Sequence, residues 1–261
     1  MQTLAHNGTW IAGLLGVLWL VSLLKRDASI IDPYWSVGIA LVCWRTALGT
    51  NELGPGQILL LSLVTLWAFR LWAYLTYRAW GEEEDFRYRA FRKRFGPQRY
   101  WWISLFQVFA LQGVLMLIIS APLQLALSAS TPVGPAQLVG GIVFAVGFLF
   151  EVVGDWQLLR FKADPANQGK VLDRGLWRYT RHPNYFGEAL LWWGLWICVL
   201  DQPYGMWTLF APMLMTVLLL KVSGVSLLEP ALTRRRPDYA AYVARTPAFF
   251  PWPPRTGVEQ D

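Results

Sequence analysis

The stretch that organises this chain is Gly175-Leu-Trp-Arg-Tyr-Thr-Arg-His-Pro-Asn-Tyr-Phe-Gly-Glu188, and the apolar run at residues 189–200 follows it directly. The apolar run is typical of a membrane-embedded helix, and Pro183 suits the first turn of that helix. Asn184 and Glu188 lie four residues apart and therefore share one helix face. Because an ionisable side chain at membrane depth is costly, Glu188 is a candidate functional residue. A basic cluster that only fixes topology would explain the arginines of this stretch but not the polar pair.

The composition is that of a membrane protein. Hydrophobic residues make up 55% of the 261 positions and charged residues only 15%, which excludes an ordinary soluble domain. Cys43 and Cys198 both lie within apolar runs, so neither a disulfide framework nor a cysteine metal site is supported. His6 and His182 lie in different environments, and we therefore expect no metal.

Apolar runs long enough, or nearly so, to cross about 30 Å of hydrocarbon recur along the chain. They predict an all-α polytopic membrane protein with about seven transmembrane helices, in one integral membrane domain over residues 1–261. Lys and Arg gather after the first, third, fifth and seventh runs, which places the N-terminus outside and the C-terminus in the cytoplasm. The net charge of +6 then reflects this bias, and we expect no nucleic-acid partner. The runs occupy residues 9–24, 29–48, 57–77, 103–127, 136–159, 184–200 and 204–228.

Three expected cytoplasmic segments are too long and too patterned to be plain connectors: residues 78–102, 160–183 and the tail 229–261. The first alternates acidic, aromatic and basic residues, which predicts an amphipathic interfacial helix. The second is rich in turn formers, and a loop of its length is usually functional or disordered. The sequence contains no P-loop and no Gly-x-Gly-x-x-Gly segment, so a cofactor must bind in the helical bundle, with these segments at its mouth.

Polar residues also occur inside the second and third runs. Asp32 precedes Pro33, and the proline is expected to bias Asp32 away from helical geometry and to leave an opening in the run. Arg70, Tyr74 and Arg78 recur at four-residue spacing, which places charge and hydroxyl on one helix face. A structural ion pair between Asp32 and Arg70 is the alternative to a functional site.

In the fifth run, Glu151 and Asp155 lie four residues apart on one face. This arrangement is costly unless hydrogen-bond donors reach both carboxylates. Ribose hydroxyls, amides and arginines are such donors. The alternative is that Glu151 and Asp155 neutralise Arg178 or Arg181.

The 175–188 motif resembles the C-terminal region of the steroid 5α-reductase family, in particular its bacterial membrane branch. The likeness extends to Trp67-Ala-Phe-Arg-Leu-Trp-Ala-Tyr74 with the Glu-Asp-x-Arg-Tyr pattern that follows, and to Glu151-Val-Val-Gly-Asp-Trp-Gln157. The resemblance implies that seven helices enclose NADPH from the cytoplasmic side. It also implies an apolar steroid-, isoprenoid- or lipid-like substrate, which enters from the bilayer and accepts hydride at a conjugated carbon–carbon double bond.

Members of that family polarise the substrate with a Gln-Glu pair in the second span and a tyrosine in the third. Here Asp32 falls near the glutamate position and Trp67 near the tyrosine position. Asp32 is therefore expected to replace the acid and Tyr34 to supply the hydroxyl, with the choice between them left open. The expected cofactor-binding residues are Arg70, Tyr74, Arg78, Glu151, Asp155, Lys162, Arg178, Arg181, His182, Asn184, Tyr185 and Glu188.

The same motif also resembles a second family. Arg181-His182-Pro183-x-Tyr185, with Glu229 and Asp238-Tyr239-x-x-Tyr242, is similar to the isoprenylcysteine carboxyl methyltransferases and related membrane enzymes. That resemblance implies S-adenosylmethionine as cofactor and a lipid-like acceptor. A non-enzymatic lipid-binding or transport protein is a further alternative, weakened by the lack of broken-helix symmetry between the two halves. In each case we expect an integral protein of the bacterial inner membrane that contacts membrane lipid, with its oligomeric state and NADPH over NADH preference left open.

Overall fold

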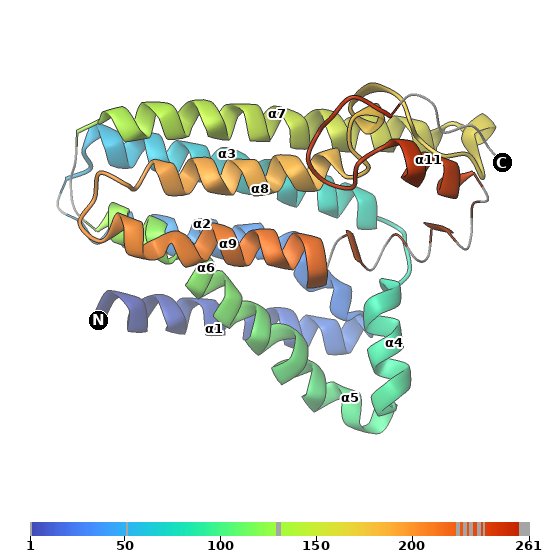
Figure 1. Cartoon of the computed structure of the whole chain (residues 1–261). Helices are drawn as coiled ribbons and strands as arrows, with labels where there is room; N and C mark the ends of the chain where they lie inside the picture. Colours follow the sequence, from blue (N-terminus) through green and yellow to red (C-terminus); the bar gives the residue numbers. More distant parts are fainter. Residues whose placement is uncertain are drawn as a thin grey trace. The chain divides into compact units, whose positions relative to one another are not determined.

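The described chain is helical and contains no β-strand within its described ranges (Figure 1), which confirms the all-α prediction. The computed structural model describes residues 2–50, 52–128, 132–222, 225, 226, 229, 232, 233, 236 and 238–255. Internal contacts group the chain into two compact units, Met1–Gly134 and Pro135–Asp261. The single membrane domain expected from the sequence stays a prediction.

The first unit is built around α2. This helix packs against α1, α3 and α6, and its Ile39, Val42 and Cys43 side chains are fully buried. The Asn7 amide donates to Thr46 Oγ1 and to Gln124 Oε1, both at 2.8 Å, and so ties α1, α2 and α6 together. The helices are α1 (Gln2–Lys25), α2 (Ile31–Ala47), α3 (Pro55–Ala79), α4 (Phe86–Phe95), α5 (Pro97–Ser104) and α6 (Leu111–Leu127), with the 3₁₀ turn η1 (Ala28–Ile30) and the π-helical turn η2 (Leu105–Ala110).

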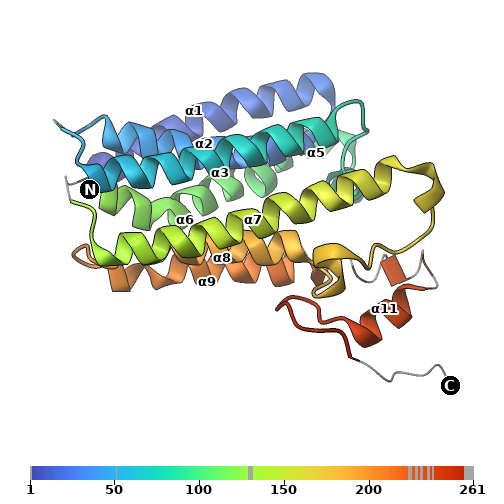
Figure 2. The same ribbon diagram turned by 90° about the horizontal axis from the view of Figure 1, so that it is seen from above.

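The second unit is organised by the pairing of α7 with α8, which lie side by side over most of the length of α8 (Figures 1 and 2). Glycines set the close approach of these helices. A Cβ atom at Gly147 would lie 2.4 Å from the Leu191 nitrogen, and one at Gly187 would lie 2.4 Å from the Glu151 nitrogen. The helices are α7 (Pro135–Ala163), α8 (Pro183–Ile197), α9 (Phe210–Val217) and α11 (Tyr239–Arg245), with the short turns η3 (Pro165–Asn167), η4 (Gly175–Arg178), η5 (Gly205–Leu209) and η6 (Leu218–Val222).

Five helical segments of the described chain are long and apolar enough to cross a membrane, as expected of an integral membrane protein. Two of the seven predicted runs form shorter helices, since α2 has 17 residues and α8 has 15. The five segments are His6–Lys25, Pro55–Ala79, Pro97–Leu127, Pro135–Ala163 and Gly205–Val222.

Two local predictions were wrong. Pro33 leaves no opening, because α2 begins at Ile31 and contains both Asp32 and Pro33. Proline is tolerated in the first turn of a helix, where its missing N–H is least needed. Residues 78–102 form no single interfacial helix: α3 continues to Ala79, and Gly96, with φ of 75°, separates α4 from α5. Only glycine adopts that backbone conformation at little cost.

Candidate functional site

The 175–188 motif docks onto the C-terminal part of α7 before it enters α8. The Leu176 N–H donates to Gln157 Oε1 at 3.0 Å, and Trp177 Nε1 donates to the Gly154 carbonyl at 3.1 Å. Trp177 is buried. These bonds hold the polar residues that follow, from Thr180 onward, beside the N-terminal end of α8.

Arg181 and His182 converge on one carboxylate, Glu229, and we call these three residues the Glu229 cluster. Arg181 Nε donates to Glu229 Oε1 at 2.7 Å, and His182 Nε2 lies 3.2 Å from the same oxygen. Burial raises the pKa of Glu229, but the hydrogen bonds from His182 and Arg181 outweigh it and lower the pKa to about 2. Arg181 and His182 are themselves only 8% and 3% exposed. Charge pairing therefore makes the burial of Arg181 tolerable.

A C-terminal tail segment, residues 239–252, wraps over the motif. Arg181 Nη1 donates to the carbonyls of Thr246 (2.5 Å) and Val243 (3.2 Å), and the Arg181 N–H donates to the Pro247 carbonyl (2.9 Å). The Thr180 hydroxyl donates to the Phe249 carbonyl at 2.8 Å. Arg181 thus anchors the tail segment as well as Glu229, a role that was not expected from its predicted contact with a cofactor.

Two tyrosines of the tail segment complete this anchoring. The Tyr242 hydroxyl donates to the Trp177 carbonyl at 2.5 Å, and its burial raises the pKa of Tyr242. Burial, together with the charge of Glu229, raises the pKa of Tyr239 to about 12. Both hydroxyls therefore stay protonated at neutral pH and can act as donors.

Asn184 offers an unused acceptor next to the Glu229 cluster. Its Nδ2 donates to Asp155 Oδ1 at 2.9 Å, which joins the start of α8 to α7. Its Oδ1 is buried and has no hydrogen-bond partner among the described residues. A buried acceptor without a partner costs free energy unless a ligand or water supplies a donor. The Asn184 carbonyl oxygen is therefore a candidate contact for a ligand or a water molecule.

Aromatic rings line the first turn of α8. Tyr185 stacks on His182 with ring centres 5.6 Å apart and planes 8° from parallel. Phe186 packs edge-on against Phe150 of α7 and Phe249 of the tail segment. The turn that carries Asn184 is therefore held on several sides by rings as well as by hydrogen bonds.

The remaining expected cofactor residues of the second unit lie on α7, η4 and α8. Glu151 and Asp155 are buried on α7, at 1% and 3% exposure. Lys162 and Arg178 are exposed, and Glu188 is half-buried on α8. The structure thus places Asp155, Arg181, His182, Asn184 and Tyr185 around the start of α8, and their cofactor contacts stay predictions.

In the first unit, the predicted polar face of α3 is confirmed. The guanidinium carbons of Arg70 and Arg78 lie 5.2 Å and 5.7 Å from the centre of the Tyr74 ring. These distances match cation–π contacts between residues four apart on one helix. Tyr34, on α2, is 36% exposed.

Asp32 has two partners on α4. Arg87 Nη2 pairs with Asp32 Oδ2 and the Tyr88 hydroxyl donates to Asp32 Oδ1, both at 2.6 Å. Gln112 Nε2 reaches the Tyr88 hydroxyl at 3.3 Å. Arg87 also donates to Asp85, the N-cap of α4, at 2.9 Å. Asp32 therefore fastens α4 to the first turn of α2.

Sequence reasoning missed Arg87 and Tyr88 as partners of Asp32, since both lie in a segment interpreted as a surface helix. The available signal was the Glu-Asp-x-Arg-Tyr pattern, in which Asp85 caps the helix that carries them. Thr180 was also missed. Its position directly before Arg181 and His182 was the only hint.

Apolar helices of spanning length, with buried Arg181 and His182 paired to Glu229 before the start of α8, define a helical membrane protein with a polar site. The chain belongs to the family described as "Protein of unknown function (DUF1295)", which matches residues 18–246. This family is related to steroid 5α-reductase-like and methyltransferase-like membrane proteins.

Two relatives show how far the similarity extends. An uncharacterised protein of Schizosaccharomyces pombe is 25% identical over 273 residues, covering 94% of this chain and 78% of that protein. A probable O-methyltransferase, UstE, of Ustilaginoidea virens is 37% identical over 76 residues, covering 29% of this chain and 27% of that protein. No solved structure matches the chain.

Proposed function

We propose that this protein is an NADPH-dependent membrane reductase that acts on a conjugated carbon–carbon double bond in an apolar, lipid-like substrate. The supporting observation is the buried Asn184 Oδ1 without a partner among the described residues, beside Asp155. A nicotinamide carboxamide carries an N–H₂ donor for such an oxygen, and ribose hydroxyls are further donors. The resemblance of the 175–188 motif to the steroid 5α-reductases points to the same cofactor.

The residues around the start of α8 have separate tasks in this proposal. Asn184 accepts from the carboxamide, while its own amide group keeps Asp155 oriented. The exposed Arg178 and Lys162 supply positive charge for the cofactor phosphates. The Glu229 cluster holds the tail segment over the motif and so limits water at the site.

NADPH held at the start of α8 would supply a hydride to the β-carbon of the conjugated alkene. Negative charge would develop on the substrate carbonyl oxygen, where a donor must stabilise it until a proton from a side chain or from water is added at the α-carbon. Asp32 and Tyr34 stay the predicted donors. Arg87 and Tyr88 occupy both carboxylate oxygens of Asp32, so contact of Asp32 with a substrate oxygen requires one of these partners to move. Asp32→Asn separates these roles: turnover falls about a hundredfold with NADPH affinity retained if Asp32 is the acid.

A second candidate function is S-adenosylmethionine-dependent methyl transfer to a lipid-like acceptor. It is favoured by the partial similarity to a probable O-methyltransferase and by the Glu229 cluster. A carboxylate held by Arg181 and His182 suits recognition of a zwitterionic cofactor. The buried Asn184 acceptor is the reason for ranking reduction first.

Isothermal titration of the purified protein with each cofactor distinguishes the two functions. The reductase proposal expects NADPH binding that weakens as salt is raised, because cationic side chains hold the phosphates. S-adenosylmethionine serves as the matched ligand. Tight binding of S-adenosylmethionine with no heat from NADPH would replace reduction by methyl transfer.

A further inference from the structure

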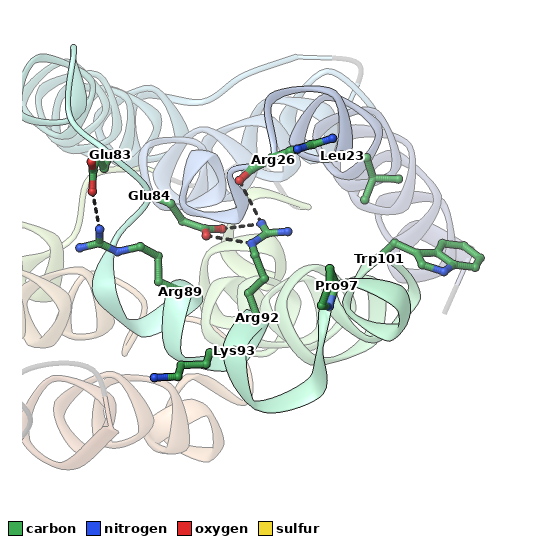
Figure 3. A pocket seen from close by; sticks show the side chains of 9 residues that line it. All are labelled: Leu23, Arg26, Glu83, Glu84, Arg89, Arg92, Lys93, Pro97 and Trp101. Atoms are coloured by element: carbon green, nitrogen blue, oxygen red, sulfur yellow. Dashed lines mark hydrogen bonds and ion pairs between the residues drawn. The ribbon is translucent and has the colours of Figure 1, made fainter.

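A cavity of about 940 Å³ opens where α1 ends and α4 meets α5, within the first unit (Figure 3). Its apolar wall includes Leu23 of α1 and Trp101 of α5. Trp19 Nε1 donates to the Trp101 carbonyl at 2.9 Å, which fixes this wall. The cavity therefore adjoins the end of the apolar segment His6–Lys25, where a helix of spanning length would pass from acyl chains to head groups.

The polar wall of the cavity is built on an ion pair whose carboxylate, Glu84, is buried. Arg92 donates from Nε and Nη2 to the two oxygens of Glu84, at 3.0 Å and 2.7 Å. Glu84 Oε1 also accepts the Ala28 N–H at 2.8 Å, and the Glu84 side chain is only 7% exposed. Arg92 further lies over the Tyr100 ring, 4.5 Å from its centre. These contacts between Arg92, Glu84, Ala28 and Tyr100 hold the polar wall in place without a ligand.

Arg26 is held at the rim by the same arginine. The backbone of Arg26 is left-handed, with φ of 54°, which is unfavourable for a residue with a side chain. Arg92 Nη2 donates to the Arg26 carbonyl at 3.1 Å, as the dashed line in Figure 3 shows. The conformation ends α1 and presents the exposed Arg26 side chain at the cavity.

The charges of the lining do not balance. Four cations and two carboxylates line the cavity. The carboxylates are already paired, Glu84 with Arg92 and Glu83 with Arg89. The exposed side chains of Arg26 and Lys93 form no ion pair with any described residue. Two uncompensated cations beside an apolar wall are complementary to a phosphate that carries hydrocarbon chains.

We propose that this cavity binds the head group of an anionic phospholipid, with Arg26 and Lys93 supplying positive charge from two sides of the rim and the acyl chains along Leu23 and Trp101 (Figure 3). The cationic rim favours an anionic over a zwitterionic lipid. The apolar wall favours a lipid over a soluble phosphate, because α1 continues it with the exposed Leu20 and Leu24. The bound lipid would hold the junction of α4 and α5, at Gly96, against the membrane surface.

The test measures binding of short-chain phosphatidylglycerol and phosphatidylcholine to the full-length protein in nonionic detergent, by native mass spectrometry. The wild type is expected to prefer phosphatidylglycerol. Arg26→Gln/Lys93→Gln is expected to weaken that binding by about twenty-five-fold, since each cation near an anionic lipid contributes about fivefold. The matched control Arg94→Gln/Arg99→Gln removes the same charge from the same segment outside the lining and is expected to change binding by less than about twofold.

Equal weakening in both double variants would overturn the proposal, because it would mean general surface attraction. Equal binding of both lipids by the wild type would also overturn it. Displacement of the lipid by inorganic phosphate or NADPH at similar concentration would assign the cavity to a soluble anion. Should the double variant fail to fold, Lys93→Gln alone, at an exposed position on α4, carries the same test with an expected loss of about fivefold.

Discussion

Glu229 pairs with two side chains, Arg181 and His182, that are far from it in the sequence. The charge of Glu229 makes the burial of these two side chains tolerable. Arg181 Nε and His182 Nε2 both lie within hydrogen-bond distance of Glu229 Oε1. The same Arg181 binds two carbonyls of the tail segment. Loss of the Glu229 charge therefore loosens the motif and the tail segment together.

The stability of the fold should depend on pH through Glu229. Its folded-state pKa of about 2 lies below the ordinary value of 4.5. The ionised carboxylate therefore stabilises the fold above pH 4.5, and this contribution disappears as the pH falls from about 4.5 towards 2. Thermal unfolding midpoints of the purified protein between pH 7 and pH 3 measure this dependence.

Glu229→Gln should lower the unfolding midpoint at pH 7 and flatten its decline below pH 4.5. Glu82→Gln makes the same chemical change at an exposed residue and serves as the control. An unchanged pH profile in Glu229→Gln would show that the cluster contributes nothing to stability.

A substitution of Asn184 is the most direct test of the proposed cofactor site. Asn184→Ala removes the buried acceptor and should weaken NADPH binding about tenfold, the scale of one hydrogen bond. Asn167→Ala removes an amide that donates to the Phe161 carbonyl on the same unit, and should leave the affinity within about twofold. Equal affinities for wild type and Asn184→Ala in isothermal titration would remove Asn184 from the cofactor site.

At the scale of elements, the contact between α7 and α8 decides where the site residues lie. The backbones approach so closely that a Cβ at Gly147 or Gly187 would overlap the neighbouring helix. This approach brings Asp155 within 2.9 Å of Asn184. The predicted cofactor residues of both helices therefore depend on these glycines for their positions.

Gly147→Ala should destabilise the protein by about 1–3 kcal/mol, the usual cost of overpacking a tight contact. Gly141→Ala is the matched control on the same helix, since a Cβ there meets nothing within 4 Å. The control should be neutral or stabilising by about 0.5–1 kcal/mol, because alanine favours helix over glycine. Denaturant titrations of the two variants compare these free energies, and equal destabilisation would contradict the close contact.

Helix-internal features were predictable from the sequence, whereas contacts between elements were not. The face shared by Arg70, Tyr74 and Arg78 follows from helix geometry alone. The partner of Arg181 lies 48 residues away, and Asp32 meets Arg87 at a separation of 55. Periodicity carries no information on such pairings, which depend on how helices pack.

At the scale of the whole molecule, the arrangement in the membrane is a proposal that can be tested directly. We propose seven spans with the N-terminus outside and the C-terminus in the cytoplasm, in a bacterial inner membrane. Among the residues that the structure describes, five helical segments meet the length and composition of a span, while α2 and α8 are shorter. The proposal needs α2 and α8 to cross as well, because otherwise the basic loops would not share one side.

Labelling of single introduced cysteines tests this topology. The native Cys43 and Cys198 are buried, so a membrane-impermeant thiol reagent should give little background on intact cells. Glu52→Cys and Pro203→Cys lie in predicted outer loops and should be labelled in intact cells. Glu82→Cys and Gln168→Cys lie in predicted cytoplasmic loops and should be labelled only after the membrane is permeabilised. Labelling of Gln168→Cys and Pro203→Cys from the same side would mean that α8 does not cross the membrane, and the seven-span arrangement would be wrong.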